Sequence, residues 1–150
     1  MKSIFIYYSY TGNGEEVASK LKDQNVDIRK VIRKKKLPKS FFFGVLTGGF
    51  LASFKVKDKL VDFNEDISEF EHIIIGSPIW NARFSSPINT VLSKLDLSNK
   101  KVTFILYSGS GDAPKTIKRI HKEYKDAQII VLKEPKKYPE ELNKLNQLVL

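Results

Sequence analysis

The sequence has 150 residues, the length of one domain, and it contains no cysteine. The lack of cysteine excludes disulfides, iron–sulfur clusters, thiolate zinc sites and a cysteine nucleophile. Because 26 Lys and Arg stand against 17 Asp and Glu, the net charge is +9, and nucleic acid, an anionic membrane or an acidic protein must be weighed as partners.

Short, continuous apolar runs predict strands that are buried on both faces, as in a parallel sheet covered by helices. These runs are Ile4 to Tyr8, Ile73 to Ile75, Val102 to Tyr107 and Ile129 to Leu132. The first run is too short for the core of a signal peptide, so we expect a cytoplasmic protein. A fifth run, Val26 to Ile32, mixes charged and β-branched residues, which is typical of a strand at the sheet edge.

Segments with helical spacing separate the predicted strands. They are Glu15 to Asp23, Pro87 to Leu95, Pro114 to Tyr124 and Pro139 to Leu150. Strands that alternate with helices predict βαβ units with right-handed crossovers. We therefore expect residues 1–150 to form one α/β domain with three layers, in which a doubly wound parallel sheet of five strands is covered on both faces.

Ligands of a doubly wound sheet bind beyond the carboxyl ends of its strands, so the residues that follow the first strand are informative. They read Ser9-Tyr10-Thr11-Gly12-Asn13-Gly14 and lead into a predicted helix. Hydroxyl, amide and backbone N–H groups at a helix N-terminus can hold a phosphate. No lysine follows Gly14, so this is not a Walker A loop. From these residues alone, a phosphate site and a simple turn are both open.

Two further polar or aromatic segments follow the third and fourth predicted strands. The first, Gly76 to Pro87, contains the candidate residues Ser77, Pro78, Ile79, Trp80, Asn81 and Phe84. The second contains Ser108, Gly109, Ser110 and Asp112. A Pro-containing loop can hold an indole flat against a ring, and small residues let backbone N–H groups approach a planar heterocycle closely.

The three segments together resemble the cofactor loops of the flavodoxin family. Ser9, Thr11, Gly12 and Asn13 match the phosphate-loop pattern Thr/Ser-x-Thr-Gly-Asn-Thr/Ser, whereas Gly14 replaces its last hydroxyl. The segment from Gly76 to Trp80 is similar to the family's Gly-Ser/Thr-Pro-x-Trp loop, whose aromatic residue flanks the flavin. The resemblance implies the sheet order 2-1-3-4-5, FMN as the cofactor, the residues named above as its binding site, and redox chemistry without a catalytic side chain.

Two activities fit the resemblance. The first is electron transfer between partner proteins, and the basic balance then favours a redox partner with an acidic docking face. The alternative is an NAD(P)H-dependent reductase that passes electrons from FMN to a quinone or another small acceptor. A third class, a flavin-free interaction protein that uses its basic surface, is kept as a rival.

A basic and apolar segment follows the predicted edge strand. Seven basic residues and no acidic residue lie between Arg29 and Lys39, and the apolar stretch Phe41 to Phe54 comes next. It is interrupted by glycines and is too short to span a membrane, although peripheral membrane contact stays open. The favoured interpretation is a second helix and loop packed on the sheet, with Phe and Leu turned inward.

The remaining charged residues indicate neither nucleic-acid nor metal binding. The lysines are scattered and no stacking surface is evident, so no specific nucleic acid is expected. The carboxylates between Asp62 and Glu71 lack metal-ligand spacing, and no metal is expected. We expect His72 to begin a strand and His121 to lie in a helix, both in structural roles.

Overall fold

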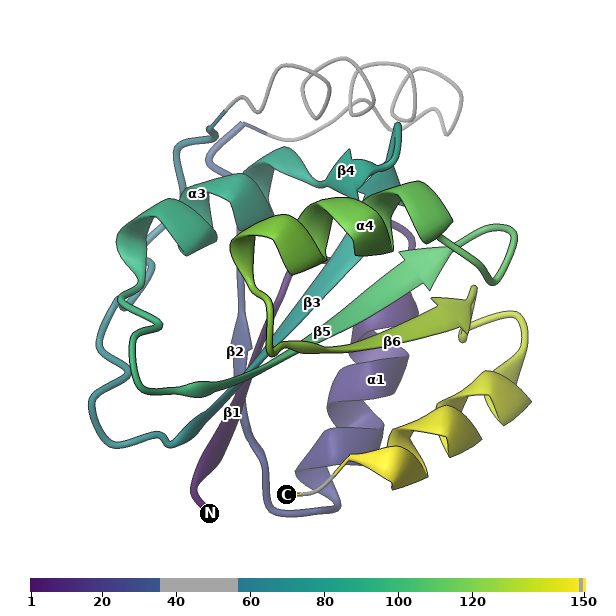
Figure 1. The fold of residues 1–150 in the computed structure, drawn as a ribbon, viewed down its shortest axis with the longest axis horizontal. Helices are drawn as coiled ribbons and strands as arrows, with labels where there is room; N and C mark the ends of the chain where they lie inside the picture. The colour runs from purple at the N-terminus through teal and green to yellow at the C-terminus, as the bar shows by residue number, and fades with distance from the viewer. Residues whose placement is uncertain (36–56, 149) are drawn as a thin grey trace.

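The computed structural model describes residues 1–35, 57–148 and 150 and shows a three-layer α/β fold (Figure 1). Five parallel strands form the middle layer: β1 (Ser3–Tyr7), β2 (Asp27–Lys30), β3 (His72–Trp80), β5 (Lys101–Ser108) and β6 (Gln128–Lys133). The helices are α1 (Asn13–Lys22), α3 (Ser86–Lys94) and α4 (Pro114–Glu123), with a 3-10 helix, η1 (Pro139–Gln147), near the C-terminus. The predicted α/β class is confirmed.

The strand order is β2-β1-β3-β5-β6, and every neighbouring pair along this path is parallel. Numbered along the chain, the five parallel strands stand in the predicted order 2-1-3-4-5. β2 lies at the sheet edge, as its mixed sequence indicated, and His72 is the first residue of β3. The order places β1 and β3 side by side at the centre, where the direction of winding reverses and ligands of such sheets bind.

Each face of the sheet has its own core because side chains alternate along a strand. On one face, Ile4, Ile73 and Phe104 belong to a cluster with Ile88 of α3 and Ile120 of α4. On the other face, Phe5, Ile74 and Ile105 belong to a cluster with Val17 and Leu21 of α1 and Leu145 of η1. Figure 1 accordingly shows α3 and α4 over one face and α1 and η1 over the other.

The third strand differs from the prediction in length. The sequence indicated a loop from Gly76 onward, but β3 continues through Trp80 and then reverses into the short strand β4 (Arg83–Phe84). Ile79 pairs with Phe84 and Trp80 pairs with Arg83, both antiparallel. The hairpin extends beyond the edge of the parallel sheet. Pro78, which has no backbone N–H, can be accommodated where the hairpin leaves the sheet, because fewer inter-strand hydrogen bonds are required there.

The C-terminal segment also differs in type. Helical spacing predicted a helix over Pro139 to Leu150, and the structure has a 3-10 helix over Pro139–Gln147. Leu142, Leu145 and Leu148 recur every three residues, which is the period of a 3-10 helix, and they pack against the core on the α1 side. The spacing therefore contained the observed period, although it was interpreted as that of an α-helix.

The predicted second helix and the apolar stretch Phe41 to Phe54 lie outside the described residues. In the part of the chain that the structure describes, no helix is both long and apolar enough to cross a membrane.

Candidate functional site

The segment that follows β1 is organised by the hydroxyl group of Ser9. Its Oγ accepts hydrogen bonds from the backbone N–H groups of Gly12 (3.2 Å) and Gly14 (3.1 Å). The Ser9 side chain also bonds the carboxylate of Glu15. Ser9 therefore serves to fold the loop around the N-terminus of α1, where unpaired helix N–H groups favour an anion.

The two glycines of this loop are required for different reasons. Gly12 has a φ of +97°, a left-handed conformation that other residues rarely adopt. A Cβ at Gly14 would lie 2.5 Å from Cδ2 of Tyr7 and 2.8 Å from Cβ of Ser9, so the place of a side chain is already filled. The departure of Gly14 from the family pattern follows from the large Tyr7 at the end of β1.

Thr11 and Asn13 are tied to the segment that follows β6. The side-chain amide of Asn13 donates to Oγ1 of Thr11 (3.1 Å), and its Oδ1 accepts from the backbone N–H of Lys136 (3.1 Å). The Lys136 ammonium group donates to the carbonyl of Thr11 (3.4 Å). The Lys136 ammonium group thus lies on the predicted phosphate loop. No sequence motif connects Lys136 with this loop.

The first turn of α1 carries two carboxylates, Glu15 and Glu16, which oppose anion binding. Glu15 is neutralised by Lys30, whose Nζ lies 2.6 Å from its Oε1. Although burial acts in the opposite direction, the hydrogen bonds from Lys30 and Ser9 hold the pKa of Glu15 below its usual value. The Glu15 charge is therefore paired at neutral pH, and Lys136 adds a positive charge beside the loop.

The β3–β4 hairpin is anchored by Ser77, whose side chain is fully buried. The Ser77 hydroxyl lies 3.1 Å from the Ser85 hydroxyl and donates to the Pro78 carbonyl at 2.8 Å. At the tip, Asn81 and Ala82 have φ values of +49° and +55°, as a two-residue hairpin turn needs. These contacts fix the position of Trp80, the last residue of β3.

Trp80 is 7% exposed and packs at the carboxyl end of the sheet. Its ring makes edge contacts with Tyr8 (5.9 Å, 79°) and Tyr10 (6.1 Å, 80°). The structure thus brings Trp80 and the loop after β1 together. A flat stack on the indole requires the side chains that cover it, Tyr10 among them, to move aside.

Hydrogen bonds from two serine hydroxyls within the loop stabilise the segment after β5. The hydroxyls of Ser108 and Ser110 donate to the carbonyl of Asp112 at 2.9 and 3.0 Å, and the Asp112 carboxylate accepts from the N–H of Ala113. Gly109 has open space around the position of a Cβ, with no atom within 4 Å. The backbone at Gly109 is therefore accessible to a planar group.

The three predicted segments lie at the carboxyl edge of the parallel sheet. The first follows β1, the second spans the end of β3 and the β3–β4 hairpin, and the third begins at the last residue of β5. The strand register places Tyr7 beside Gly76 and Pro78 beside Tyr107. A hollow of about 300 Å³ opens next to the first segment and is lined by Tyr8, Ser9, Tyr10 and residues 30–33. Among the residues that the structure describes, no cluster of His, Asp or Glu has the arrangement of a metal site.

A buried ion pair that includes Arg33, a lining residue of this hollow, was not predicted from the sequence. Arg33 Nη2 lies 2.9 Å from Oδ1 of Asp58, and both side chains are largely buried. The other carboxylate oxygen of Asp58 accepts from the Ser86 hydroxyl at the start of α3. Burial raises the pKa of Tyr8, against the opposing effect of the neighbouring Arg33 guanidinium. In the sequence, 24 residues separate the two charges, so only the fold reveals the pair.

These features define a doubly wound α/β protein with a candidate nucleotide-cofactor site at its carboxyl edge. The sequence profile of the flavodoxin family matches residues 51–146, about two thirds of the chain. The chain therefore belongs to the flavodoxin family. The matched range includes the β3–β4 hairpin and the segment after β5, whereas the loop from Ser9 to Gly14 lies before it.

Solved structures with the same fold cover nearly the whole chain. A protein of Bacteroides eggerthii classed as a flavoprotein has a TM-score of 0.74 at 20% identity, over 97% of this chain and 96% of its own. A Lactobacillus acidophilus flavoprotein in complex with FMN has a TM-score of 0.67 at 16% identity, over 93% and 97% of the two chains. No curated protein sequence matches the chain.

Proposed function

We propose that residues 1–150 act as one FMN-binding domain that transfers electrons between partner proteins. The observation that carries the proposal is the meeting of three cofactor-type segments at one sheet edge, with a helix N-terminus and Lys136 on the first of them. The family membership and the FMN complex of the Lactobacillus acidophilus protein support the choice of cofactor.

The donors of the first segment fit a phosphate group. Ser9 is committed to the loop itself, since it accepts two backbone N–H groups and bonds Glu15. The groups that hold the phosphate are then the Thr11 hydroxyl, the Asn13 amide, the helix N–H groups and the Lys136 ammonium. Gly14 contributes no side chain, and Lys136 compensates for the missing hydroxyl with a charge.

The flavin ring would lie between the β3–β4 hairpin and the loop after β5. Bound FMN supplies the electron-accepting ring, and the chain supplies its surroundings. On one side, Tyr10 moves aside and the Trp80 indole stacks on the flavin ring, while Asn81 at the exposed hairpin tip lies at the edge of the ring. On the other side the open backbone at Gly109 approaches it, and the serine-bonded loop keeps that backbone rigid.

The net charge of +9 suits electron transfer to an acidic protein. Charge steers diffusional encounter when the partner's charge is opposite, and this steering weakens as salt is added. No described residue assigns a site for a quinone or a nicotinamide, so the carrier role is proposed ahead of the reductase role. Steady-state oxidation of NAD(P)H with a quinone separates the two, because turnover would establish the reductase and its absence supports the carrier.

The binding site is tested by titrating purified protein with FMN and following flavin absorbance and tryptophan fluorescence. Saturable binding with quenching of Trp80, the one tryptophan of the chain, is expected. Thr11→Val should weaken binding about tenfold, which corresponds to the loss of one charge-assisted hydrogen bond. The matched control is Ser98→Ala, which removes a hydroxyl at the opposite edge, before β5, and should bind like the wild type. A colourless protein that never binds FMN would refute the proposal.

A further inference from the structure

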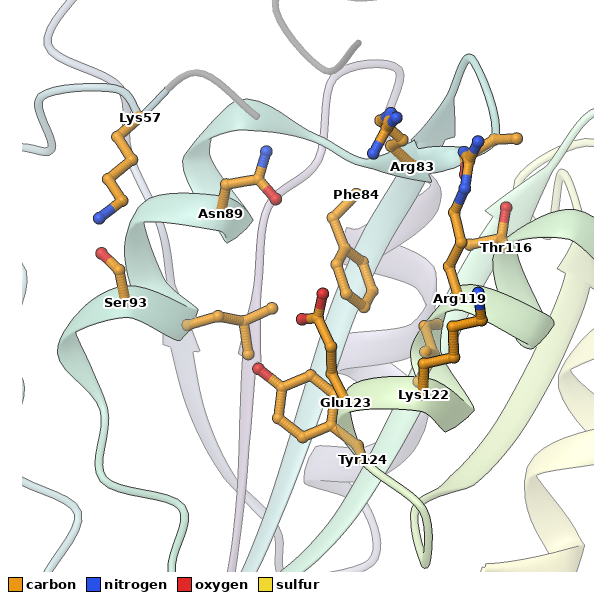
Figure 2. Close-up of a pocket in the computed structure, with 13 residues that line it drawn as sticks. Lys57, Arg83, Phe84, Asn89, Ser93, Thr116, Arg119, Lys122, Glu123 and Tyr124 are labelled. Carbon is orange, nitrogen blue, oxygen red and sulfur yellow. The ribbon is translucent and has the colours of Figure 1, made fainter. Parts of the chain in front are cut away.

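A cavity of about 340 Å³ lies on the face of the sheet between α3 and α4, beneath the β3–β4 hairpin (Figure 2). Residues from all three elements line it, among them Leu92 of α3, Ile120 of α4 and Phe84 of β4. Of the residues predicted to contact FMN, only Phe84 takes part. The cavity is therefore a separate site, in the size range of pockets that hold small organic molecules.

The interior of the cavity is apolar and firmly supported. Phe84 and Tyr124 each pack against the buried Phe104, with ring centroids 5.1 Å apart in both pairs. Leu92 and Ile120 complete the apolar lining between the two helices. Such a surface binds the hydrocarbon part of a ligand by removing it from water.

Basic side chains outnumber acidic ones among the described residues that line the cavity. The lining includes four basic side chains, Lys57, Arg83, Arg119 and Lys122, and one carboxylate, Glu123. Figure 2 shows the guanidinium groups of Arg83 and Arg119 on the same side of the cavity, with the Glu123 carboxylate closer to the Phe84 ring.

The Arg119 guanidinium is held in place by the hairpin. Its Nη1 donates to the Ala82 carbonyl at 2.7 Å, which occupies one of its five N–H donors. A positioned arginine of this kind loses little freedom when a carboxylate binds it through two parallel hydrogen bonds.

Two polar groups in the wall lack partners among the described residues. Thr116 is 2% exposed, and its hydroxyl oxygen has no hydrogen-bond partner in the part of the chain that the structure describes. The side-chain amide nitrogen of Asn89, across the cavity on α3, is buried and also without one. Unsatisfied buried polar groups are rare in native proteins, and these two lie within the walls of the cavity, shielded from solvent.

We propose that this cavity binds a small organic anion with an apolar body, such as an aromatic carboxylate. The carboxylate pairs with Arg83 and Arg119, and the hydrocarbon part lies on Phe84, Leu92, Ile120 and Tyr124. Since Ala82 and Phe84 belong to the hairpin that also carries Trp80, the bound anion rests on an element of the proposed flavin site. The binding itself does not depend on FMN.

The test uses 2-naphthoate as the probe and two-dimensional amide NMR of the full chain, with and without FMN. Saturable shifts should map to the amides of Phe84, Leu92 and Ile120. Arg83→Gln should weaken binding about tenfold, whereas Glu123→Gln should strengthen it, because it removes the one carboxylate of the lining. Lys118→Gln on the exposed side of α4 is the matched control and should bind like the wild type.

The neutral 2-naphthamide separates charge recognition from simple hydrophobic binding, and it should bind more weakly than 2-naphthoate. Equal affinity for both probes, equal affinity in the Arg83 and Lys118 variants, or shifts that map to residues 9–14 would overturn the proposal. If 2-naphthoate binds as expected and FMN does not, the proposed function fails while the anion site stands.

Discussion

The replacement of Gly14 by serine restores the hydroxyl of the family pattern and tests whether the Tyr7 ring leaves room for a side chain at this position. A Cβ at this position would lie 2.5 Å from Cδ2 and 2.9 Å from Cε2 of Tyr7, and 2.8 Å from Cβ of Ser9. Real Cβ atoms do not approach neighbours so closely, so the Tyr7 ring or the loop must shift. The ring has little room to do so, since it stacks on Phe5 at 5.0 Å and is 4% exposed.

The expected cost follows from two opposing effects. Overpacking a well-filled core costs about 1–3 kcal/mol. Replacement of glycine near the start of a helix recovers a fraction of about 1 kcal/mol in helix propensity. We therefore expect Gly14→Ser to lower the free energy of unfolding by about 1–2 kcal/mol, equivalent to a fall in Tm of roughly 2–8 °C for a chain of this length.

Urea denaturation followed by circular dichroism measures this change. Gly109→Ala is the matched control, because nothing lies within 4 Å of its Cβ position, and its stability should stay within about 0.5 kcal/mol of the wild type. The additional change Tyr7→Leu should make Gly14→Ser less costly than it is alone. A Gly14→Ser variant as stable as the wild type would show that the Tyr7 contact does not exclude a side chain here.

The remaining predictions concern pH, the buried ion pair and the phosphate loop. Burial lowers the pKa of His72 to about 4, below its unfolded value of about 6.5, so His72 stays neutral in the folded state while it becomes protonated in the unfolded state as the pH falls. The free energy of unfolding should therefore fall by about 2.5 kcal/mol between pH 7 and pH 4.5. Denaturation at the two pH values should show this loss in wild type and His121→Gln but not in His72→Gln, and equal loss in all three would refute the assignment. Asp58→Asn leaves the buried Arg33 charge unpaired and should cost about 3 kcal/mol in urea denaturation, and a cost below 1 kcal/mol would contradict a buried pair. Lys136→Gln should weaken FMN binding and reduce its salt dependence, and affinity equal to wild type at low salt would remove Lys136 from the phosphate site.

The sequence predicted the sheet because its strands are continuous apolar runs, and buried parallel strands have that composition. It missed the extension of β3 because Gly76 and Pro78 usually end a strand. Here Gly76 is needed inside the strand, since a Cβ would collide with Phe5 and the Tyr107 hydroxyl. The requirement comes from neighbouring strands, and a single segment of sequence does not contain it.

The candidate site was predictable where one local segment carries its chemistry, as in the loop after β1. The residues that complete the site were not predictable, because they come from distant parts of the chain. Lys136 reaches Thr11 from 125 positions away. In the separate cavity, the contact between Arg119 and Ala82 likewise joins residues 37 positions apart. Burial of Trp80 by Tyr8 and Tyr10 is likewise a property of the folded chain.

We propose above all that the segment from Ser9 to Gly14 binds the phosphate of FMN. Parallel titrations with FMN and riboflavin test it most directly, because the two molecules share the ring and differ by the phosphate. Two charge-assisted hydrogen bonds at about 1.5 kcal/mol each predict that FMN binds about 100-fold more tightly. Equal affinity for FMN and riboflavin would contradict the claim.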